Sequence, residues 1–415
     1  MTAALEGQFA ARWRAAGGPK RLLLAVSGGG DSIALLRLCL PLSEAGVTLH
    51  VATVDHGLRP QSAADAEFVS EESRRFGLPC AILRWGGAKP RTGVQAAARA
   101  RRYRLLAGEA MRIGADAILT AHTADDQAET ILMRIAHRTG VRGLAGMAPE
   151  NLIADGAGPP QRLLRLLIEE RRASLREYLS LSGARFIDDP SNDDPVFERV
   201  RARRLLRASS DTLAPALMTL AGRARALQSL ADRLERRQFH RAEGNFLADG
   251  GVLLSSLDDP GLAARLLRAV GGGDHDPDDA AAADALAAAR NGRRSTLAGA
   301  IVEPCDGGLL IRREPAAVLG RAGSQSLSAL RLRPGERLLW DRRFSVTNIF
   351  SAPAEVRPLG PDAKALQARR LPGLETAPGL FLDGRLAAFA GDDGAGEVAI
   401  ANLVPERFAR AVLRF

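Results

Sequence analysis

Residues 22–36 read LLLAVSGGGDSIALL, and this stretch decides the fold of the first part of the chain. An apolar run ends at Val26, three glycines follow, and the next apolar run has helical spacing. A strand, a glycine-rich turn and a helix present backbone N–H groups at the helix start, where an anion can bind. The stretch therefore predicts a phosphate-binding loop over Ser27–Ser32.

This loop differs from better-known phosphate loops. It fits neither GxxxxGK[ST] nor GxGxxG, and it carries Asp31 where a lysine would be expected. A simpler interpretation is a tight turn in which Asp31 or Ser32 only caps the helix. Three consecutive glycines cost more conformational entropy than a cap requires, so close approach of a ligand to the backbone is favoured.

Strand-like and helix-like segments alternate from residue 21 to residue 137. The apolar, strand-like runs are 21–26, 47–54, 80–85 and 117–121. The helical patterns fall at about 32–40, 61–77, 93–113 and 124–137. This alternation predicts an α/β fold, a doubly wound and mainly parallel sheet with helices on both faces. Ligands of such folds bind at the carboxyl ends of the strands.

A second polar segment, TVDHGLRP at 53–60, follows the second predicted strand. It can be a simple turn, in which Asp55 caps and Gly57 turns the chain. Its position also places His56 and Arg59 at the ligand-binding edge of the predicted sheet. Binding of the same ligand as the glycine-rich loop is the favoured interpretation.

A third segment, AHTADDQAETILMRI at 121–135, begins a predicted helix. At about 100° per residue, His122, Asp126 and Glu129 share a face with Met133, and Asp125 lies at its margin. Acidic residues also suit a helix start because of the helix dipole. That argument does not require a histidine with three carboxylates, which could instead hold Mg²⁺ or bind an ammonium group. The remaining apolar positions, Ala128, Ile131, Leu132 and Ile135, are expected to face the core.

Two arginine-rich segments are consistent with a polyanionic partner. In GVQAAARARRYRLL at 93–106, helical spacing places Arg99 and Arg102 near Tyr103. The segment DDPSNDDPVFERVRARRLL at 188–206 and the next residue crowd two helical turns with Arg199, Arg201, Arg203, Arg204 and Arg207. Such residues usually form a solvated face, but beside a nucleotide site they suit phosphate contacts.

Length, charge and cysteine content limit the remaining possibilities. At 415 residues the chain exceeds one ordinary core, so two or three domains are expected. The net charge of +9 favours a polyanionic partner. No apolar run is long enough to span a membrane and no signal core is present, which predicts a cytoplasmic protein. Cys39, Cys80 and Cys305 are scattered, which argues against a metal site or a disulfide framework.

The remainder of the chain divides into a helical and a strand-rich part. A long amphipathic helix is expected from Asp211 to about Arg241, and an alanine-rich helix at 279–290. From about residue 324 short strands dominate, and LFLDGRLAAF predicts a hairpin at its Asp-Gly pair. The expected domains are 1–210, a mostly helical 211–320, and a small α+β domain at 321–415.

Taken together, SGGGDS, DHGLR, HTADDQAET, RTGVRGLAGM and DDPSNDDPVFERVRAR resemble the tRNA(Ile)-lysidine synthetase family. That family belongs to the N-type ATP pyrophosphatases, which have an adenine nucleotide α-hydrolase-like fold. The resemblance covers residues 20–207, and the layout of the later domains extends it. Three residues depart from the family pattern: Ala121 stands for a glycine, Leu166 for a proline and Val200 for an asparagine.

The resemblance implies an ATP-dependent ligase. ATP would adenylate the C2 oxygen of the wobble cytidine in the isoleucine tRNA with anticodon CAU, releasing pyrophosphate. The amine of free L-lysine would then displace AMP and give lysidine. The implied partners are this tRNA, lysine, ATP and Mg²⁺, with no membrane; a homodimer is left open.

The resemblance also implies roles for individual residues. The catalytic residues would be Asp31, His122 and Asp126, with the general base left open. The residues binding ATP would be Ser27, Gly28, Gly29, Gly30, Asp31, Ser32, Asp55, His56 and Arg99. Lysine would be bound by His122, Asp126 and Glu129, and Mg²⁺ by Asp31 and Asp125. Arg199, Arg201 and Arg203 would bind tRNA, with residues 211–320 contributing and 321–415 recognising the acceptor stem.

Three other functions compete with this one. A tRNA-thiolating relative would need paired cysteines or an iron–sulfur cluster, which the three scattered cysteines do not supply. An amidotransferase-coupled synthetase would need a glutaminase. A basic tRNA-binding protein with a vestigial nucleotide site is the non-enzymatic alternative, and the intact SGGGDS and HTADDQAET segments argue against it.

Overall fold

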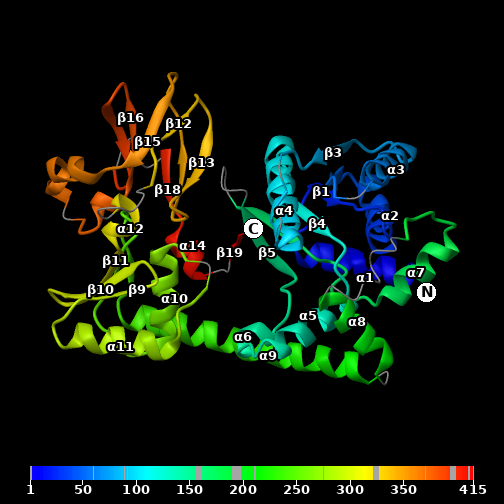
Figure 1. Ribbon diagram of the computed structural model, residues 1–415, viewed down its shortest axis with the longest axis horizontal. Helices are drawn as coiled ribbons and strands as arrows, with labels where there is room; N and C mark the ends of the chain where they lie inside the picture. The colour runs from blue at the N-terminus through cyan, green and yellow to red at the C-terminus, as the bar shows by residue number, and fades with distance from the viewer. Residues whose placement is uncertain are drawn as a thin grey trace. The chain divides into compact units, whose positions relative to one another are not determined.

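The computed structural model describes residues 2–58, 60–87, 89–90, 92–154, 160–188, 198–209, 212–273, 275–320, 327–369, 371–392, 399–409 and 412–414. The chain forms two compact units (Figure 1). Residues 1–155 and 160–231 make up nearly all of the first unit, and residues 232–413 most of the second. The expected domain boundaries at 210 and 320 stay predictions.

A mainly parallel sheet forms the centre of the first unit. Its strands are β1 (Arg21–Ala25), β2 (Thr48–Asp55), β3 (Cys80–Arg84), β4 (Ala117–Thr120), β5 (Glu150–Ala154) and β6 (Gln161–Leu164). They lie in the order β5–β6–β4–β1–β2–β3, and only β5 and β6 pair antiparallel. The chain therefore has the predicted doubly wound, mainly parallel sheet.

The helices of this part of the chain are α1 (Thr2–Ala15), α2 (Gly30–Glu44), α3 (Ser62–Arg75), α4 (Val94–Ile113), α5 (Ala124–Ala136), α6 (Val141–Leu144), α7 (Arg172–Leu181) and α8 (Glu198–Ala208). Of these, α2, α3 and α4 pack against the strands of the sheet. In Figure 1, α2 and α3 lie on one side of the strands and α4 on the other. Leu22 and Leu24 of β1 are fully buried, as a central parallel strand requires.

A smaller apolar cluster joins α5 to α9 (Leu213–Arg241) within the first unit. Ala128 and Ile131 of α5 pack there with Leu217 and Ala221 of α9. The predicted long helix is thereby confirmed. The expectation for Ile135 is wrong, because this side chain lies in the last turn of α5 and is 41% exposed.

The second unit is built from three antiparallel sheets and short helices. Its strands are β7 (Asn245–Phe246), β8 (Val252–Leu254), β9 (Ser295–Leu297), β10 (Ala300–Cys305), β11 (Gly308–Arg313), β12 (Leu330–Leu332), β13 (Arg337–Trp340), β14 (Phe344–Thr347), β15 (Ala354–Pro358), β16 (Pro378–Leu382), β17 (Arg385–Phe389) and β18 (Ile400–Asn402). Its helices are α10 (Pro260–Gly271), α11 (Asp279–Arg290), α12 (Pro315–Leu319), η2 (Gly360–Arg369), η3 (Leu374–Thr376) and α14 (Val404–Ala409); β19 (Val412–Arg414) ends the described chain. The sheet orders are β7–β8–β11–β10–β9, β12–β15–β16–β17 and β13–β14–β18.

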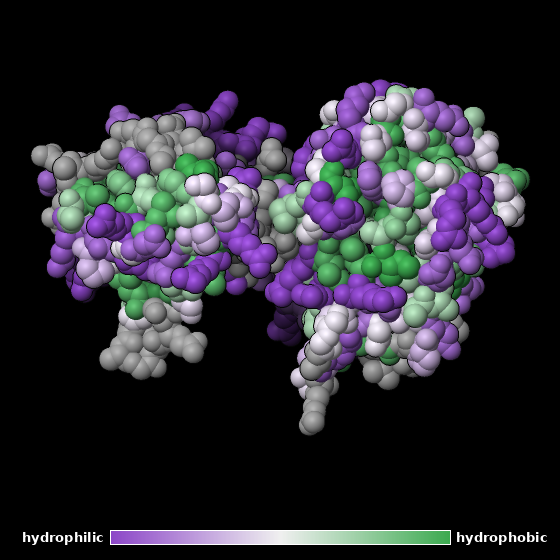
Figure 2. Space-filling view, turned by 90° about the horizontal axis from the view of Figure 1, so that it is seen from above, coloured by the Kyte–Doolittle hydropathy of each residue, from purple (hydrophilic) through white to green (hydrophobic). Residues whose placement is uncertain are grey.

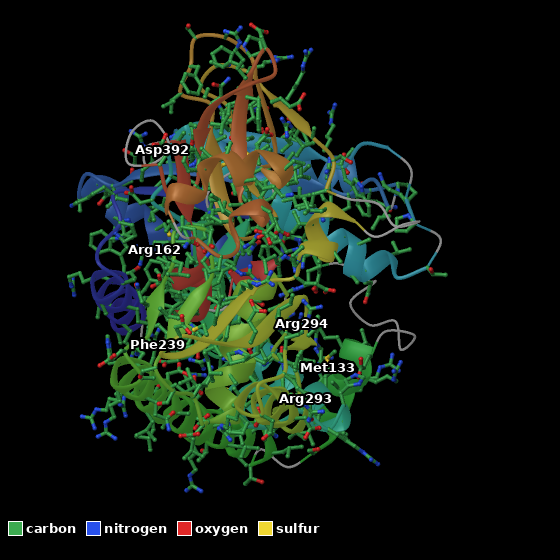
Figure 3. The ribbon with its side chains drawn as sticks, turned by 90° about the vertical axis from the view of Figure 1, so that its left-hand side faces the viewer. Met133, Arg162, Phe239, Arg293, Arg294 and Asp392 are labelled. Carbon is green, nitrogen blue, oxygen red and sulfur yellow. The ribbon has the colours of Figure 1, made fainter. Side chains whose placement is uncertain are left out.

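Local sequence signals explain several features of this unit. The predicted Asp-Gly hairpin joins β16 and β17, with φ of +48° at Asp383 and +78° at Gly384, as a two-residue hairpin turn requires. Phe239, labelled in Figure 3, packs against Phe246 with ring centroids 4.9 Å apart. Its ring also lies 5.2 Å from that of Phe408, so α9 ends in an aromatic core.

On the face visible in Figure 2, hydrophilic side chains separate the apolar areas. Within the described ranges, no helix combines the length and the apolar character needed to cross a bilayer.

Candidate functional site

The glycine-rich loop lies between β1 and α2, at the carboxyl edge of the sheet. Gly28 has φ of +87°, and its carbonyl accepts a 2.9 Å bond from the N–H of Ile187. A Cβ at Gly28 would lie 2.6 Å from Cδ1 of Ile187. The packing of the protein itself therefore requires glycine at this position.

The next two glycines have no such requirement. A Cβ at Gly29 would meet no atom closer than 3.9 Å, and one at Gly30 none closer than 3.5 Å. Neither residue has a positive φ. Because the protein's own packing would accept a side chain at both positions, their glycines favour close approach of a ligand to this backbone.

The capping interpretation of the loop is not supported. The N-cap of α2 is Gly29, and no side-chain capping hydrogen bond is made there. Ser32 Oγ donates to the carbonyl of Gly29 at 2.8 Å and accepts from the N–H of Ser27 at 3.2 Å, so it closes the loop. Asp31 instead accepts a bond from another part of the chain, Nε of Arg172, at 3.0 Å.

The start of α5 is fixed by a capping box. Thr123 Oγ1 accepts from the N–H of Asp126, and the N–H of Thr123 donates to Oδ2 of Asp126 at 2.9 Å. This reciprocal pair follows from a Thr three residues before an Asp at a helix start. It buries Asp126, whose other oxygen, Oδ1, turns toward two guanidinium groups.

Arg172, at the first turn of α7, joins the loop to α5, and the sequence analysis missed it. Its Nη2 donates to Asp126 Oδ1 at 2.9 Å while its Nε holds Asp31, and its Nη1 lies 3.6 Å from Glu129 Oε1. Its backbone N–H donates to Asp125 Oδ2 at 2.7 Å. One signal was available: an arginine in the first turn of a helix opposes the helix dipole, which points to a compensating acid.

Two arginines of α8 complete this cluster. Glu129 is 1% exposed, and its two oxygens each accept a 2.7 Å bond, from Nε of Arg199 and Nε of Arg203. Arg199 Nη2 also donates to Asp126 Oδ1 at 3.1 Å. We call the seven residues that meet here the carboxylate–guanidinium cluster: Asp31, Asp125, Asp126, Glu129, Arg172, Arg199 and Arg203.

The electrostatics of the cluster follow from burial and pairing. Burial raises the pKa of Asp31, although Arg172 opposes this. Burial also acts to raise the pKa of Asp126, but Arg199 and Arg172 outweigh it, and the net pKa is lowered. Burial acts to lower the pKa of Arg172, and Asp126 and Asp31 reverse the shift. Asp126 is therefore a carboxylate and Arg172 a cation at neutral pH.

His122 lies at the end of β4, directly before this cluster. Its Nδ1 is 2.9 Å from Oγ1 of Thr120, within hydrogen-bond distance. Burial, reinforced by the positive charge of Arg165, lowers the pKa of His122 to about 3. The imidazole is therefore neutral over the physiological range.

The segment after β2 contains a turn, as the alternative interpretation expected. Asp55 Oδ1 accepts from the N–H of Gly57 at 2.9 Å and from Oγ of Ser62 at 2.7 Å. The bond from Ser62 contributes most to lowering the pKa of Asp55. The ring of His56 packs edge-on against Trp85, with centroids 6.3 Å apart. Arg59 lies outside the described residues.

The remaining residues singled out in the sequence lie in different surroundings. The guanidinium group of Arg99 lies over the ring of Tyr103, 5.1 Å from its centroid. Arg201 is on the exposed side of α8, whereas Arg199 and Arg203 face α5. Two of the departures from the family pattern, Leu166 and Val200, are buried at 5% and 6% exposure. Ala121, the third, packs partly buried against the main core.

No preformed metal cage is present in the described part of the chain. It holds no group of three or more His, Cys, Asp or Glu side chains arranged for a metal ion. The three cysteines are free, and burial raises the pKa of the Cys39 thiol. A buried, protonated thiol is a poor nucleophile, which argues against thiol chemistry at Cys39.

A glycine-rich loop at a parallel-strand end, facing a buried acidic cluster, defines a nucleotide-binding α/β domain, and residues 3–209 match the PP-loop domain family. Over a longer stretch the chain is similar to curated relatives. It is 37% identical to the tRNA(Ile)-lysidine synthase of Ruegeria pomeroyi over 374 residues, which covers 86% of this chain and 82% of that protein. It is 39% identical to the tRNA(Ile)-lysidine synthase of Methylobacterium nodulans over 333 residues, 73% of this chain and 93% of that protein. The chain belongs to the tRNA(Ile)-lysidine synthase family.

A solved structure also shows a likeness to this chain. The U34-tRNA thiolase NcsA from Methanococcus maripaludis aligns with a TM-score of 0.42 and 14% sequence identity, over 49% of this chain and 71% of that chain.

Proposed function

We propose that this chain uses ATP to join free L-lysine to C2 of the wobble cytidine in the isoleucine tRNA with anticodon CAU. The cytidine C2 oxygen attacks the α-phosphorus of ATP, the bond to the β-phosphate breaks, and pyrophosphate leaves. The lysine amine then attacks C2, the C2–O bond breaks, and AMP leaves with that oxygen. The observation that supports this function best is the loop at Gly29 and Gly30, linked through Asp31 and Arg172 to the acidic start of α5.

The loop suits the first step because a departing pyrophosphate needs donors that are already in place. Backbone N–H groups of residues 28–31, at the start of α2, would supply these hydrogen-bond donors. Ser27, Ser32, Asp55, His56 and Arg99 are the further proposed ATP contacts. The absence of a Walker-type lysine agrees with cleavage between the α- and β-phosphates.

The carboxylate oxygens at the carboxyl edge of the sheet are ligands that suit Mg²⁺. Asp31 and Asp125 are the residues that would hold it, and both contact Arg172 through one oxygen, Oδ2. Mg²⁺ typically binds one or two carboxylates together with substrate phosphates and water, so a cage of three side chains is not needed. When bound, it would neutralise negative charge on the leaving group.

The lysine substrate carries positive charge, and Asp126 and Glu129 are the proposed recognition groups. Both carboxylates already form an ion pair with the guanidinium group of Arg199. His122 is the third proposed lysine contact, and its neutral imidazole adds no positive charge that would repel the ammonium group. Asp31, His122 and Asp126 are the proposed catalytic residues.

Recognition of the tRNA is proposed for several parts of the chain. Arg199, Arg201 and Arg203 would contact its backbone near the catalytic site, and residues 211–320 and 321–415 would bind the tRNA body and acceptor stem. The net charge of +9 supports a polyanionic partner. The proposed location is the cytoplasm.

The experiment is incorporation of labelled lysine into purified tRNA. Label should enter only when ATP and the CAU-anticodon isoleucine tRNA are both present, and Asp31→Ala should abolish it. A transcript with uridine at the wobble position is the matched RNA control. Transfer of sulfur to the tRNA, or tight tRNA binding with no lysine incorporation under any condition, would establish one of the competing functions.

A further inference from the structure

Helix α8 presents arginines on two opposite sides. Arg199 and Arg203, one helical turn apart, face α5 and bind Glu129. Arg201 and Arg204 point away from that side, and both are exposed to solvent. We call these two residues the outer arginines of α8. A single helix of 11 residues thus touches the proposed lysine site with one side and offers a basic surface with the other.

The arginines on the inner side of α8 occupy the hydrogen-bonding positions of the carboxylates that are proposed to bind lysine. Both oxygens of Glu129 accept guanidinium bonds, and this side chain is 1% exposed. Asp126 Oδ1 accepts hydrogen bonds from Arg172 and Arg199, and its Oδ2 accepts a hydrogen bond from Thr123 in the capping box. A lysine ammonium group can therefore bind these carboxylates only by displacing a guanidinium group.

Val200 and Ala202 of α8 are buried, but the remaining polar attachment of the helix to α5 is modest. At its start, Glu198 Oε1 lies 2.8 Å from Nε2 of His137, but both side chains are well exposed, and such surface pairs contribute about 1 kcal/mol or less. Leu206 is only partly buried against the α5–α9 cluster, and Leu205 is 54% exposed. The inner arginines are thus the principal polar contacts that hold the helix in this position.

From this arrangement we infer that α8 couples RNA binding to lysine binding, an inference that rests on the proposed function. RNA phosphates bind the outer arginines and compete for Arg199, whose side chain is 36% exposed. The resulting shift of α8 withdraws Arg199 and Arg203 from Glu129 and Asp126. These carboxylates then accept the ammonium group, so lysine binds the RNA-bound enzyme in preference to the free enzyme.

Equilibrium dialysis of labelled lysine against the full-length protein tests this inference directly. No ATP is added, so binding is measured without reaction. The CAU-anticodon tRNA transcript should tighten lysine binding at least about tenfold, and by linkage lysine should tighten RNA binding by the same factor. Equal lysine affinity with and without the transcript would overturn the inference.

Variants of α8 separate the roles of its two sides. Arg203→Gln should bind lysine more tightly than the unchanged protein in the absence of RNA, because one competing guanidinium group is gone. Arg203→Lys, which keeps a cation there, should gain less lysine affinity than Arg203→Gln. The combined change of Arg201 and Arg204 to Gln should weaken RNA binding and reduce its salt dependence, by about one unit of slope for each phosphate that is no longer neutralised.

The control is Arg176→Gln in α7, which removes one charge from an arginine that is 56% exposed and lies outside the carboxylate–guanidinium cluster. It should change neither lysine nor RNA affinity. If Arg203→Gln retains its thermal unfolding transition and gains no lysine affinity, the coupling by α8 is wrong. That result is distinguishable from failure of the proposed function, since the unchanged protein would still incorporate lysine into tRNA.

Discussion

Arg172 is the residue on which the carboxylate–guanidinium cluster depends most. It binds Asp31 on one side and Asp126 on the other, and its side chain is 19% exposed. Removing one partner of a buried ion pair is costly because it leaves the other charge desolvated and unpaired.

We expect Arg172→Gln to lower the free energy of unfolding by about 3 kcal/mol, because it removes the guanidinium group that pairs with Asp31 and leaves Asp126 paired with Arg199 alone. Urea denaturation followed by circular dichroism measures this. Arg176→Gln, on the same helix, should change the free energy by less than about 0.5 kcal/mol because its ion pair is exposed and long, at 3.9 Å. Equal effects of the two substitutions would show that the cluster contributes nothing to stability.

His122 should make the stability of the protein depend on pH. Its pKa is about 3 in the folded protein, against an ordinary value of 6.5. Between these values the unfolded chain binds the extra proton, so stability is lost as the pH falls below about 6.5. The slope from this residue should be about 1.4 kcal/mol per pH unit.

The measurement is the free energy of unfolding at several pH values from 7 down to 4, for the unchanged protein and for His122→Gln. The difference between the two proteins isolates the imidazole from the carboxylates nearby. If the two curves stay parallel over this range, the folded-state pKa of His122 is not depressed.

The residue scale is also where sequence reasoning reached its limit. The spacing of Asp126 and Glu129 correctly placed them near each other at the start of a helix. It gave no indication that Arg172, more than 40 residues later in the chain, donates to Asp126. A contact of this kind depends on how two helices pack, and the pattern within each helix does not contain that information.

At the scale of elements, the strands and helices of residues 21–137 were predicted with boundaries within a few residues, except that α2 extends four residues beyond its prediction, and the later strands β5 and β6 were not predicted. Their apolar runs are bounded by glycines and polar turns, and both signals are local. The buried run before the loop became β1, and the Asp-Gly pair in the second unit became a hairpin. Local signals of this kind predict which element forms, whereas the pairing order β4–β1–β2–β3 follows only from the fold class.

The glycine-rich loop provides a prediction that separates folding from binding. Gly28→Ala should destabilise the protein by about 1–3 kcal/mol, because its φ is +87° and the new Cβ would collide with Ile187. Gly29→Ala should change the free energy of unfolding by less than about 1 kcal/mol, because φ is −70° and the nearest atom would be 3.9 Å from the new Cβ, while alanine is a poorer N-cap than glycine.

The same Gly29→Ala substitution should raise the KM for ATP, because the methyl group occupies space that the proposed phosphates need. Thermal unfolding and steady-state kinetics on the same preparation measure both effects. A Gly29→Ala protein with unchanged stability and unchanged KM would refute the assignment of this backbone to phosphate binding.

At the scale of the whole molecule, the charge and length gave only general expectations. The net charge of +9 favours a polyanion but does not indicate where it binds. The two compact units agree with the expectation of more than one domain. Arg343 is 0% exposed and donates to Asp341 at 2.7 Å. This buried ion pair could not be predicted, because an arginine in a sequence usually indicates an exposed side chain.

In the proposed reaction, the loop over Ser27–Ser32 holds a departing pyrophosphate while the RNA is adenylated. The most direct test uses ATP labelled at the α-phosphate, with the CAU-anticodon tRNA and without lysine. We predict that label becomes attached to the RNA, that pyrophosphate is released in equal amount, and that addition of lysine then frees labelled AMP. Release of inorganic phosphate in place of pyrophosphate, or release of pyrophosphate that does not require the RNA, would contradict the account.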